Sequence, residues 1–155
     1  MKKKLGLDYH GVIDTHSDIF KRMAEAWIDR GHEVHLITGT SLTEEKLKEI
    51  RAHGVPFTHS FSIIDYHESI GTKIIYDEDG NPWIDDDLWN KSKAEYCRRE
   101  RITIHFDDSE VYCDYFDLRL GDPTYIVVND ALIAAVKSGL RQHDEMEALG
   151  LNVPL

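Results

Sequence analysis

Cysteine, proline and long hydrophobic runs are scarce in this sequence of 155 residues, which has 2 cysteines and 4 prolines. Cys97 and Cys113 could form one bridge but not the disulfide framework of an extracellular domain, so we expect buried free thiols on helices. The apolar run at residues 5–7 is too short for a signal peptide, and no stretch is long enough to span a bilayer. We therefore expect a cytoplasmic protein with no membrane partner.

Positive charge is also scarce, because 18 lysines and arginines face 29 aspartates and glutamates, giving a net charge of −11. Proteins that coat nucleic acid or an anionic membrane need basic surfaces, so the charge argues against nucleic acid as a partner. A few local cations still suffice to bind one phosphate group, so a small phosphorylated substrate is not excluded. The length fits one domain that buries a core without metal or disulfide support.

Predicted strands and helices alternate along the chain. Five segments have the short apolar pattern of buried strands, at residues 3–8, 33–38, 57–64, 102–106 and 124–128. Helical patterns occur at residues 18–30, 41–54, 92–101 and 131–136, and a hairpin is predicted at 73–84. This alternation predicts an α/β, Rossmann-like fold of three layers, with a mainly parallel central sheet between helices.

Two of the helices have a predicted capping box at their start. Ser41 and Ser92 are each followed three residues later by a glutamate, and this pair of side chains can bond the free N–H groups of a first helical turn. Lys93 would then lie at a helix N-terminus, where the helix dipole disfavours a cation. The misfit indicates a role for Lys93 in neutralising bound phosphate, the alternative being an exposed lysine like nearby Lys91.

Polar residues follow three of the predicted strands, at the sheet edge where α/β proteins bind ligands. Asp8 ends the first strand before a glycine turn, and a carboxylate there can attack phosphorus or only form an Asx turn. Thr38 and Gly39 end the second, where a hydroxyl and backbone N–H groups can hold phosphate oxygens or only form a turn. Asp107 and Asp108 follow the fourth, where paired acids suit Mg²⁺ or, alternatively, a helix cap and a surface acid.

In this order, the four elements resemble the four motifs of the haloacid dehalogenase-like (HAD) superfamily, over residues 5–116. The matching residues are Asp8, Thr38, Lys93 and the pair Asp107-Asp108. The resemblance implies that Asp8 is the nucleophile and a metal ligand, and that Thr38 binds phosphate. It implies that Lys93, with Lys91 as the fallback, orients the nucleophile and balances phosphate charge, while the acidic pair completes a Mg²⁺ site.

One position departs from the family pattern. Phosphatases of the family usually carry a second aspartate two residues after the nucleophile, and here that residue is His10. The usual aspartate is the general acid/base and a metal ligand through its backbone carbonyl, and the carbonyl ligand survives the change to His10. Histidine is a capable general acid/base, so His10 is the candidate catalytic residue, with Asp14 as a conceivable substitute.

The spacing of the motifs indicates how open the site is. Asp8 and Thr38 are 30 residues apart (38 − 8), which leaves no room for a large cap domain. Thr38 and Lys93 are 55 residues apart (93 − 38), which leaves a small insert at about residues 65–90. We interpret this insert as a lid or recognition flap, the alternative being a hairpin that only completes a single domain of residues 1–155.

The function implied by the resemblance is a magnesium-dependent phosphohydrolase, a phosphatase acting through an aspartyl-phosphate on a small phosphomonoester, nucleotides included. Two alternatives stay open. A non-catalytic or regulatory domain would keep the acids but have lost acid/base function with His10. A nucleic-acid 3′-phosphatase would use an open site for large substrates, although the net charge argues against it.

Overall fold

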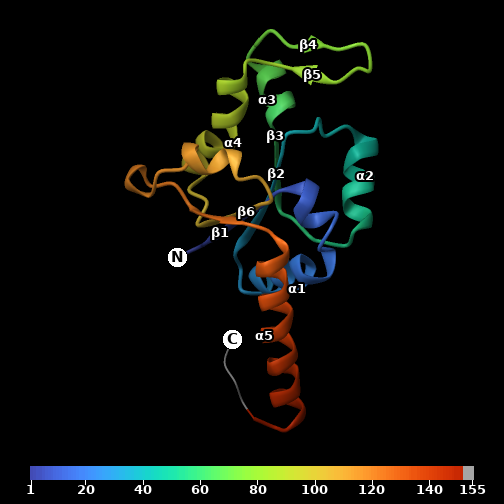
Figure 1. Ribbon diagram of the computed structural model, residues 1–155, viewed down its shortest axis with the longest axis vertical. Coiled ribbons are helices and arrows are strands. Elements are labelled where there is room, and N and C mark those ends of the chain that lie inside the picture. Colours follow the sequence, from blue (N-terminus) through green and yellow to red (C-terminus); the bar gives the residue numbers. More distant parts are fainter. Residues whose placement is uncertain (152–155) are drawn as a thin grey trace.

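The computed structural model describes residues 1–151 and confirms the predicted α/β, Rossmann-like architecture (Figure 1). Five strands form the central sheet in the order β3-β2-β1-β6-β7, and every pairing is parallel. The strands are β1 (Lys4–Leu7), β2 (Glu33–Thr38), β3 (His59–Ser62), β6 (Ile104–Asp107) and β7 (Thr124–Val127). Because the strands are parallel, their carboxyl ends share one edge of the sheet.

Helices cover both faces of the sheet. They are α1 (Ser17–Asp29), α2 (Glu44–Ala52), α3 (Ile63–Ser69), α4 (Asp86–Glu100) and α5 (Asp130–Ala148), with short turns η1 (Tyr9–Ile13), η2 (Val111–Tyr115) and η3 (Leu118–Leu120). Side chains of a strand alternate between its faces. Accordingly, Val34 and Leu36 of β2 pack in one core with α1, α2 and α5, whereas Ile37 packs in a second core with α3 and α4.

The predicted start of α4 is wrong, and the correction moves Lys93. Asp85 caps this helix, since its carboxylate accepts hydrogen bonds from the backbone N–H groups of Asp87 and Leu88. Ser92 lies inside the helix and donates its hydroxyl to the Leu88 carbonyl. An acidic cap with an acidic first turn complements the helix dipole better than Ser92 does. Lys93 therefore lies in the helix interior, and the dipole misfit does not exist.

The predicted start of α2 is also wrong. Thr43 is the cap, and its hydroxyl accepts from the backbone N–H of Lys46. Ser41 instead donates its hydroxyl to the Asp65 carboxylate of α3 at 2.6 Å. A tertiary partner for Ser41 has overridden the local capping pattern, and the bond holds the loop after β2 against α3.

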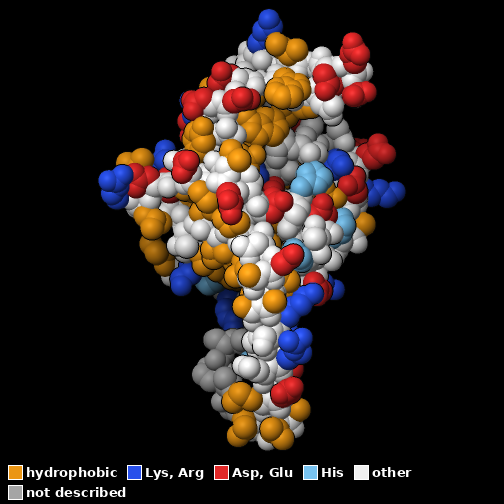
Figure 2. Space-filling model, viewed as in Figure 1, with side chains coloured by type: hydrophobic (Ala, Val, Ile, Leu, Met, Phe, Trp, Pro, Cys, Tyr) orange, Lys and Arg blue, Asp and Glu red, His pale blue; other side chains and the backbone are white. Residues whose placement is uncertain are grey.

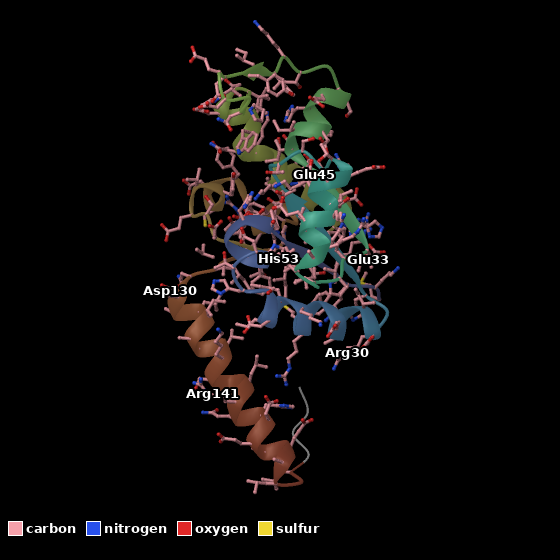
Figure 3. The ribbon with its side chains drawn as sticks, turned by 90° about the vertical axis from the view of Figure 1, so that its right-hand side faces the viewer. Arg30, Glu33, Glu45, His53, Asp130 and Arg141 are labelled. Atoms are coloured by element: carbon pink, nitrogen blue, oxygen red, sulfur yellow. The ribbon has the colours of Figure 1, made fainter. Side chains whose placement is uncertain are left out.

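Two further elements differ from prediction in length. The segment predicted as one strand at 57–64 ends at Ser62, because the Ser62 hydroxyl accepts from the N–H of Asp65 and starts α3. The last helix is much longer than 131–136, and Asn129 caps it by accepting from Leu132. Figure 3 shows Asp130 close to the sheet and Arg141 on the part of α5 that projects away from it.

The predicted insert at 65–90 is divided between two helices and a hairpin. Its ends belong to α3 and α4, and between them the predicted hairpin is present as β4 (Ile75–Tyr76) and β5 (Pro82–Trp83). The Asp77 carboxylate accepts from the backbone N–H groups of Asp79 and Asn81, which closes the turn. Over residues 1–151, this hairpin is the only sheet outside the central one.

The described residues test two expectations, that both cysteines are buried free thiols and that no segment spans a membrane. Both cysteines are free, but only Cys97 is buried; Cys113 lies exposed on η2, so the prediction of two buried thiols is wrong for it. In residues 1–151, none of the helices combines the length and apolarity that crossing a bilayer requires.

Candidate active site

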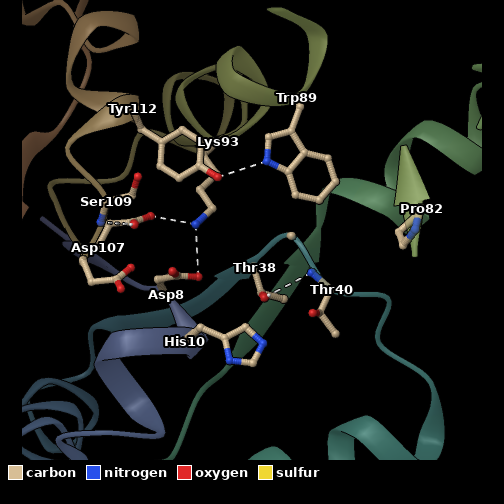
Figure 4. A pocket seen from close by; sticks show the side chains of 12 residues that line it. Asp8, His10, Thr38, Thr40, Pro82, Trp89, Lys93, Asp107, Ser109 and Tyr112 are labelled. Atoms are coloured by element: carbon tan, nitrogen blue, oxygen red, sulfur yellow. Dashed lines mark hydrogen bonds and ion pairs between the residues drawn. The ribbon is translucent and has the colours of Figure 1, made fainter. Parts of the chain in front are cut away.

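A cleft of about 330 Å³ opens at the carboxyl edge of the sheet (Figure 4). Every site residue predicted from the sequence lines it: Asp8, His10, Thr38, Gly39, Lys93, Asp107 and Asp108. Their predicted convergence on one cleft is therefore confirmed. The strands β1, β2 and β6 end side by side in the sheet, which brings their following residues together.

Lys93 lies at the centre of the polar contacts in the cleft. Its Nζ is 3.0 Å from Asp8 Oδ1 and 2.7 Å from Asp107 Oδ2, and its side chain is 2% exposed. Lys91 instead faces two acids of α4 itself, at 3.9 and 4.0 Å, on the solvent side. The structure therefore selects Lys93 over Lys91 as the lysine that contacts the predicted nucleophile.

The buried carboxylates and the ammonium shift one another's protonation. Burial raises the pKa of Asp8 to about 6, against the opposing charge of Lys93. Burial also favours neutral Asp107, but hydrogen bonds and charge from His105 and Lys93 outweigh it and lower its pKa to about 2. Burial disfavours the charged form of Lys93, yet its two carboxylate partners prevail and raise its pKa. Near neutral pH all three groups are thus predominantly charged.

The charges of the cleft fit a divalent cation. Oxygen atoms of Asp8, Asp107 and Asp108 lie within 4.8 Å of one another. Lys93 is the one lysine or arginine among the described residues that line the cleft. Three carboxylates against one ammonium leave two negative charges unbalanced, and an all-oxygen donor set is the kind that Mg²⁺ prefers. The side chains present therefore fit the predicted metal, while the His10 carbonyl ligand stays a prediction.

Gly11 brings the turn after β1 against the acidic pair. Its φ is +72°, a left-handed conformation that favours glycine, and a Cβ on it would overlap the Asp108 carboxylate. Its backbone N–H donates to Asp14 Oδ1 at 2.8 Å. Glycine at this position allows the Asp108 carboxylate to approach the turn that carries His10.

This close approach predicts a specific effect of Gly11→Ala. Gly31 has a similar φ of +77°, but no atom lies within 4 Å of the position that a Cβ would take there, so Gly31→Ala reports backbone strain alone. We expect Gly31→Ala to cost about 1–2 kcal/mol of unfolding free energy. Gly11→Ala should cost about 1–3 kcal/mol more, because a neighbour must move. Urea unfolding of both variants measures the difference, and equal losses would contradict the contact with Asp108.

Asp14 contacts His10 and is not among the described residues that line the cleft. Its Oδ2 lies 3.1 Å from His10 Nδ1, and its Oδ1 accepts from Thr15 and Gly11. Burial raises the pKa of Asp14, but these hydrogen bonds outweigh burial and lower it. An ionised carboxylate only accepts hydrogen bonds, so His10 Nδ1 carries a proton and Nε2 is the nitrogen left for the cleft. Figure 4 shows the His10 ring on the same side of the cleft as Asp8 and Thr38.

The loop after β2 offers hydrogen-bond donors to the cleft. Thr38 Oγ1 accepts from the backbone N–H of Thr40 at 3.3 Å, so its own hydroxyl proton remains to be donated. At Gly39, a Cβ would lie 2.6 Å from Cζ2 of Trp89, so glycine is needed where this indole packs on the loop. The loop is thus fixed by its contacts in a position suited to bind phosphate oxygens.

Five lining residues were not predicted as site residues: Thr40, Pro82, Trp89, Ser109 and Tyr112. Trp89 Nε1 donates to the Tyr112 hydroxyl at 3.0 Å, and Lys93 Nζ lies 4.7 Å from the centre of the Tyr112 ring. Trp89 and Lys93 are four residues apart on α4 and so share a helix face. Recognising Asp85 as the cap would have placed both on one helix and predicted this proximity.

Comparison with known proteins adds no assignment. No model of a protein family matches the chain, and a search of curated proteins gives no significant match. Any conclusion about function therefore depends on the geometry and charges of the cleft.

Proposed function

We propose that this chain is a magnesium-dependent phosphatase of the HAD type, with Asp8 as the nucleophile toward a small phosphomonoester. The observation that supports this most is the buried contact of Lys93 with both Asp8 and Asp107, beside the exposed Asp108. A phosphate dianion is repelled by a site with excess negative charge unless a cation is present. A divalent metal and Lys93 together would balance the acids and leave positive charge for phosphate.

The order of the motifs along the chain supports the same proposal. A strand-end nucleophile, a strand-end hydroxyl, a helix lysine and a strand-end acidic pair resemble the HAD pattern, and they line one cleft. Independent surface residues scattered over a chain of this size would not be expected to meet in this way. The bound Mg²⁺ would stabilise the charge that develops on the transferring phosphoryl oxygens.

The residues of the chain then divide the chemistry in two steps. An Asp8 oxygen forms a bond to phosphorus while the bond from phosphorus to the leaving oxygen breaks. For this step His10 has to be in its imidazolium form, with protons on both ring nitrogens, and it gives the Nε2 proton to the leaving oxygen. A water molecule then attacks phosphorus and passes a proton to His10, which releases phosphate and restores the Asp8 carboxylate. Throughout, Lys93 holds Asp8 in place, and Thr38 and Gly39 bind the phosphoryl oxygens.

We also propose a cytoplasmic location. Cys113 is a free and exposed thiol, which persists in a reducing compartment and tends to oxidise outside it. If this location is correct, the Cys113 thiol should still be reactive in protein taken directly from cells. A thiol-specific label should therefore modify Cys113.

The metal requirement tests the proposed function directly. In a screen of phosphomonoesters, turnover should depend on Mg²⁺, stop in chelator, and resume when Mg²⁺ is restored. Calcium should not replace it, because its larger and looser coordination shell disturbs the alignment of nucleophile and phosphorus. Phosphate release is measured in parallel with Mg²⁺, with chelator, with Mg²⁺ restored after chelator, and with Ca²⁺. Undiminished release in chelator would overturn the proposed metal chemistry.

A second prediction concerns His10 and decides between an enzyme and a domain that has lost catalysis. General acid/base groups contribute ~10²–10⁴-fold to rates, so His10→Ala should slow turnover of an alkyl phosphate by that order. It should slow an aryl phosphate with an acidic leaving group much less, because that leaving group needs little protonation. His10→Asp, which introduces the family's usual residue, should retain activity on both.

The two substrates act as each other's control. Equal rates of wild type and His10→Ala on the alkyl phosphate would remove His10 from the mechanism. Absence of turnover by all three proteins on a broad panel with Mg²⁺ would favour the non-catalytic alternative instead.

A further inference from the structure

A second cavity adjoins the cleft on the side of the hairpin. It measures about 260 Å³ and is lined by Pro82, Trp83, Ile84, Asp86 and Trp89. Pro82 and Trp89 also line the cleft that contains Asp8, so the two spaces meet at these residues. A molecule whose phosphate lies against the nucleophile can therefore extend its leaving group into the second cavity without leaving the protein surface.

The indole of Trp89 is a fixed wall between the two spaces. It packs on Gly39, where a Cβ would lie 2.6 Å from its Cζ2, and its Nε1–H donates to Tyr112 at 3.0 Å. The ring is thus held at one edge by the phosphate-binding loop and at its nitrogen by η2. Figure 4 shows Trp89 and Pro82 on the same side of the cleft, away from Asp107. A preorganised aromatic wall loses little entropy when a ligand stacks on it.

The hairpin adds exposed apolar surface to the second cavity. Trp83 of β5 is 56% exposed, although a tryptophan gains most by burial. Figure 2 shows hydrophobic side chains gathered beside a hollow on the part of the surface formed by α4 and the hairpin. Such surface next to a candidate active site indicates a ligand-binding role. Asp86 adds a carboxylate at the rim, which can accept hydrogen bonds from N–H or O–H groups.

We infer that the phosphomonoester carries a planar aromatic heterocycle of the nucleobase kind, which stacks against Trp83 and Trp89 while its phosphate faces Asp8. The substrate class is thus a nucleoside monophosphate, and this inference rests on the proposed phosphatase function. An indole favours the flat face of an aromatic ring over a sugar or an acyl chain of similar size. The net charge of −11 disfavours a longer polyanion.

Binding measurements test the ring site without requiring catalysis. We would titrate Asp8→Asn protein with adenosine 5′-monophosphate and with ribose 5-phosphate in Mg²⁺, since these ligands share the phosphate and the sugar and differ in the base. Base stacking on aromatic side chains should make the nucleotide dissociation constant about 10- to 100-fold lower. Trp83→Leu in the same protein should lower this ratio about 5-fold or more, with the remainder due to Trp89, and Trp83→Phe should keep most of it.

Tyr76→Leu is the matched control, because Tyr76 is an exposed aromatic of the same hairpin that lines neither cavity and donates to Glu68. It should leave the ratio unchanged. Equal dissociation constants of the two ligands in the Asp8→Asn protein that retains Trp83, or no binding of either, would overturn the ring site. Tighter binding of a 3′-phosphorylated oligonucleotide than of the mononucleotide would overturn the mononucleotide assignment.

Turnover by the wild type separates this inference from the function it rests on. Release of phosphate from both compounds, with equal dissociation constants, would refute the ring site alone. Release from neither compound, with a ratio that Trp83→Leu lowers, would refute the phosphatase and leave a nucleotide-binding site.

Discussion

We expect the Asp8→Asn variant to turn over phosphomonoesters at least about 10⁴-fold more slowly than the wild type, as loss of a covalent nucleophile typically causes. An amide is a far weaker nucleophile than a carboxylate, and it also removes one charge from the proposed metal site. The fold should persist, because asparagine matches aspartate in shape and Lys93 keeps its 2.7 Å contact with Asp107. Steady-state phosphate release with a purified variant measures the effect.

Asp29→Asn provides the control for a carboxylate-to-amide change as such. Asp29 is exposed at the end of α1, just before β2 begins and thus on the opposite edge of the sheet from the cleft. Its replacement should leave turnover within a factor of about two, as for most surface changes. Retention of more than about a hundredth of wild-type activity by Asp8→Asn would contradict a nucleophilic role.

Lys93→Met is expected to have the largest effect on stability. It replaces the ammonium by an apolar group of similar length and leaves Asp8 and Asp107 buried without their shared partner. Removing one member of a buried ion pair typically costs about 3–5 kcal/mol, so the unfolding free energy in chelator should fall by that amount. Urea unfolding monitored by circular dichroism gives the value.

Lys91→Met is the matched control on the same helix. Lys91 pairs only with exposed acids of α4, and such pairs contribute about 0–1 kcal/mol. Added Mg²⁺ should recover part of the Lys93→Met deficit, because a bound cation compensates the same carboxylates, and should change Lys91→Met no more than wild type. Similar losses for the two variants would show that Lys93 is not the charge partner of the buried acids.

The sequence allowed the chemical residues of the cleft to be predicted because their positions depend on local patterns. Asp8, Thr38 and Asp107 each follow or end an apolar run, and a parallel sheet brings the ends of such runs to one edge. The parallel topology then predicts that the site lies at the carboxyl edge of the sheet, without knowledge of any side-chain contact. The fold class was predictable for the same reason.

Features that depend on tertiary partners were not predictable in this way. Ser41 matches a capping box, yet it bonds Asp65, which lies 24 residues later in the chain. Tyr112 enters the site only because η2 packs on α4, which brings its hydroxyl to Trp89. The contact between His10 and Asp14 is suggested by their spacing of four positions in the sequence. Predicting it also required the conformation of the turn around Gly11, which the sequence pattern did not provide.

The central claim is that Asp8 forms a covalent bond to the transferred phosphoryl group, and chemical trapping tests it most directly. Wild-type protein would be mixed with Mg²⁺ and a phosphomonoester that it hydrolyses, quenched in acid, treated with borohydride and analysed by peptide mass spectrometry. Borohydride reduces an acyl phosphate to an alcohol, so the account predicts homoserine at position 8, absent without substrate and absent in chelator. Phosphate release with an unmodified position 8, or with the reduced residue at another carboxylate such as Asp107 or Asp14, would contradict it.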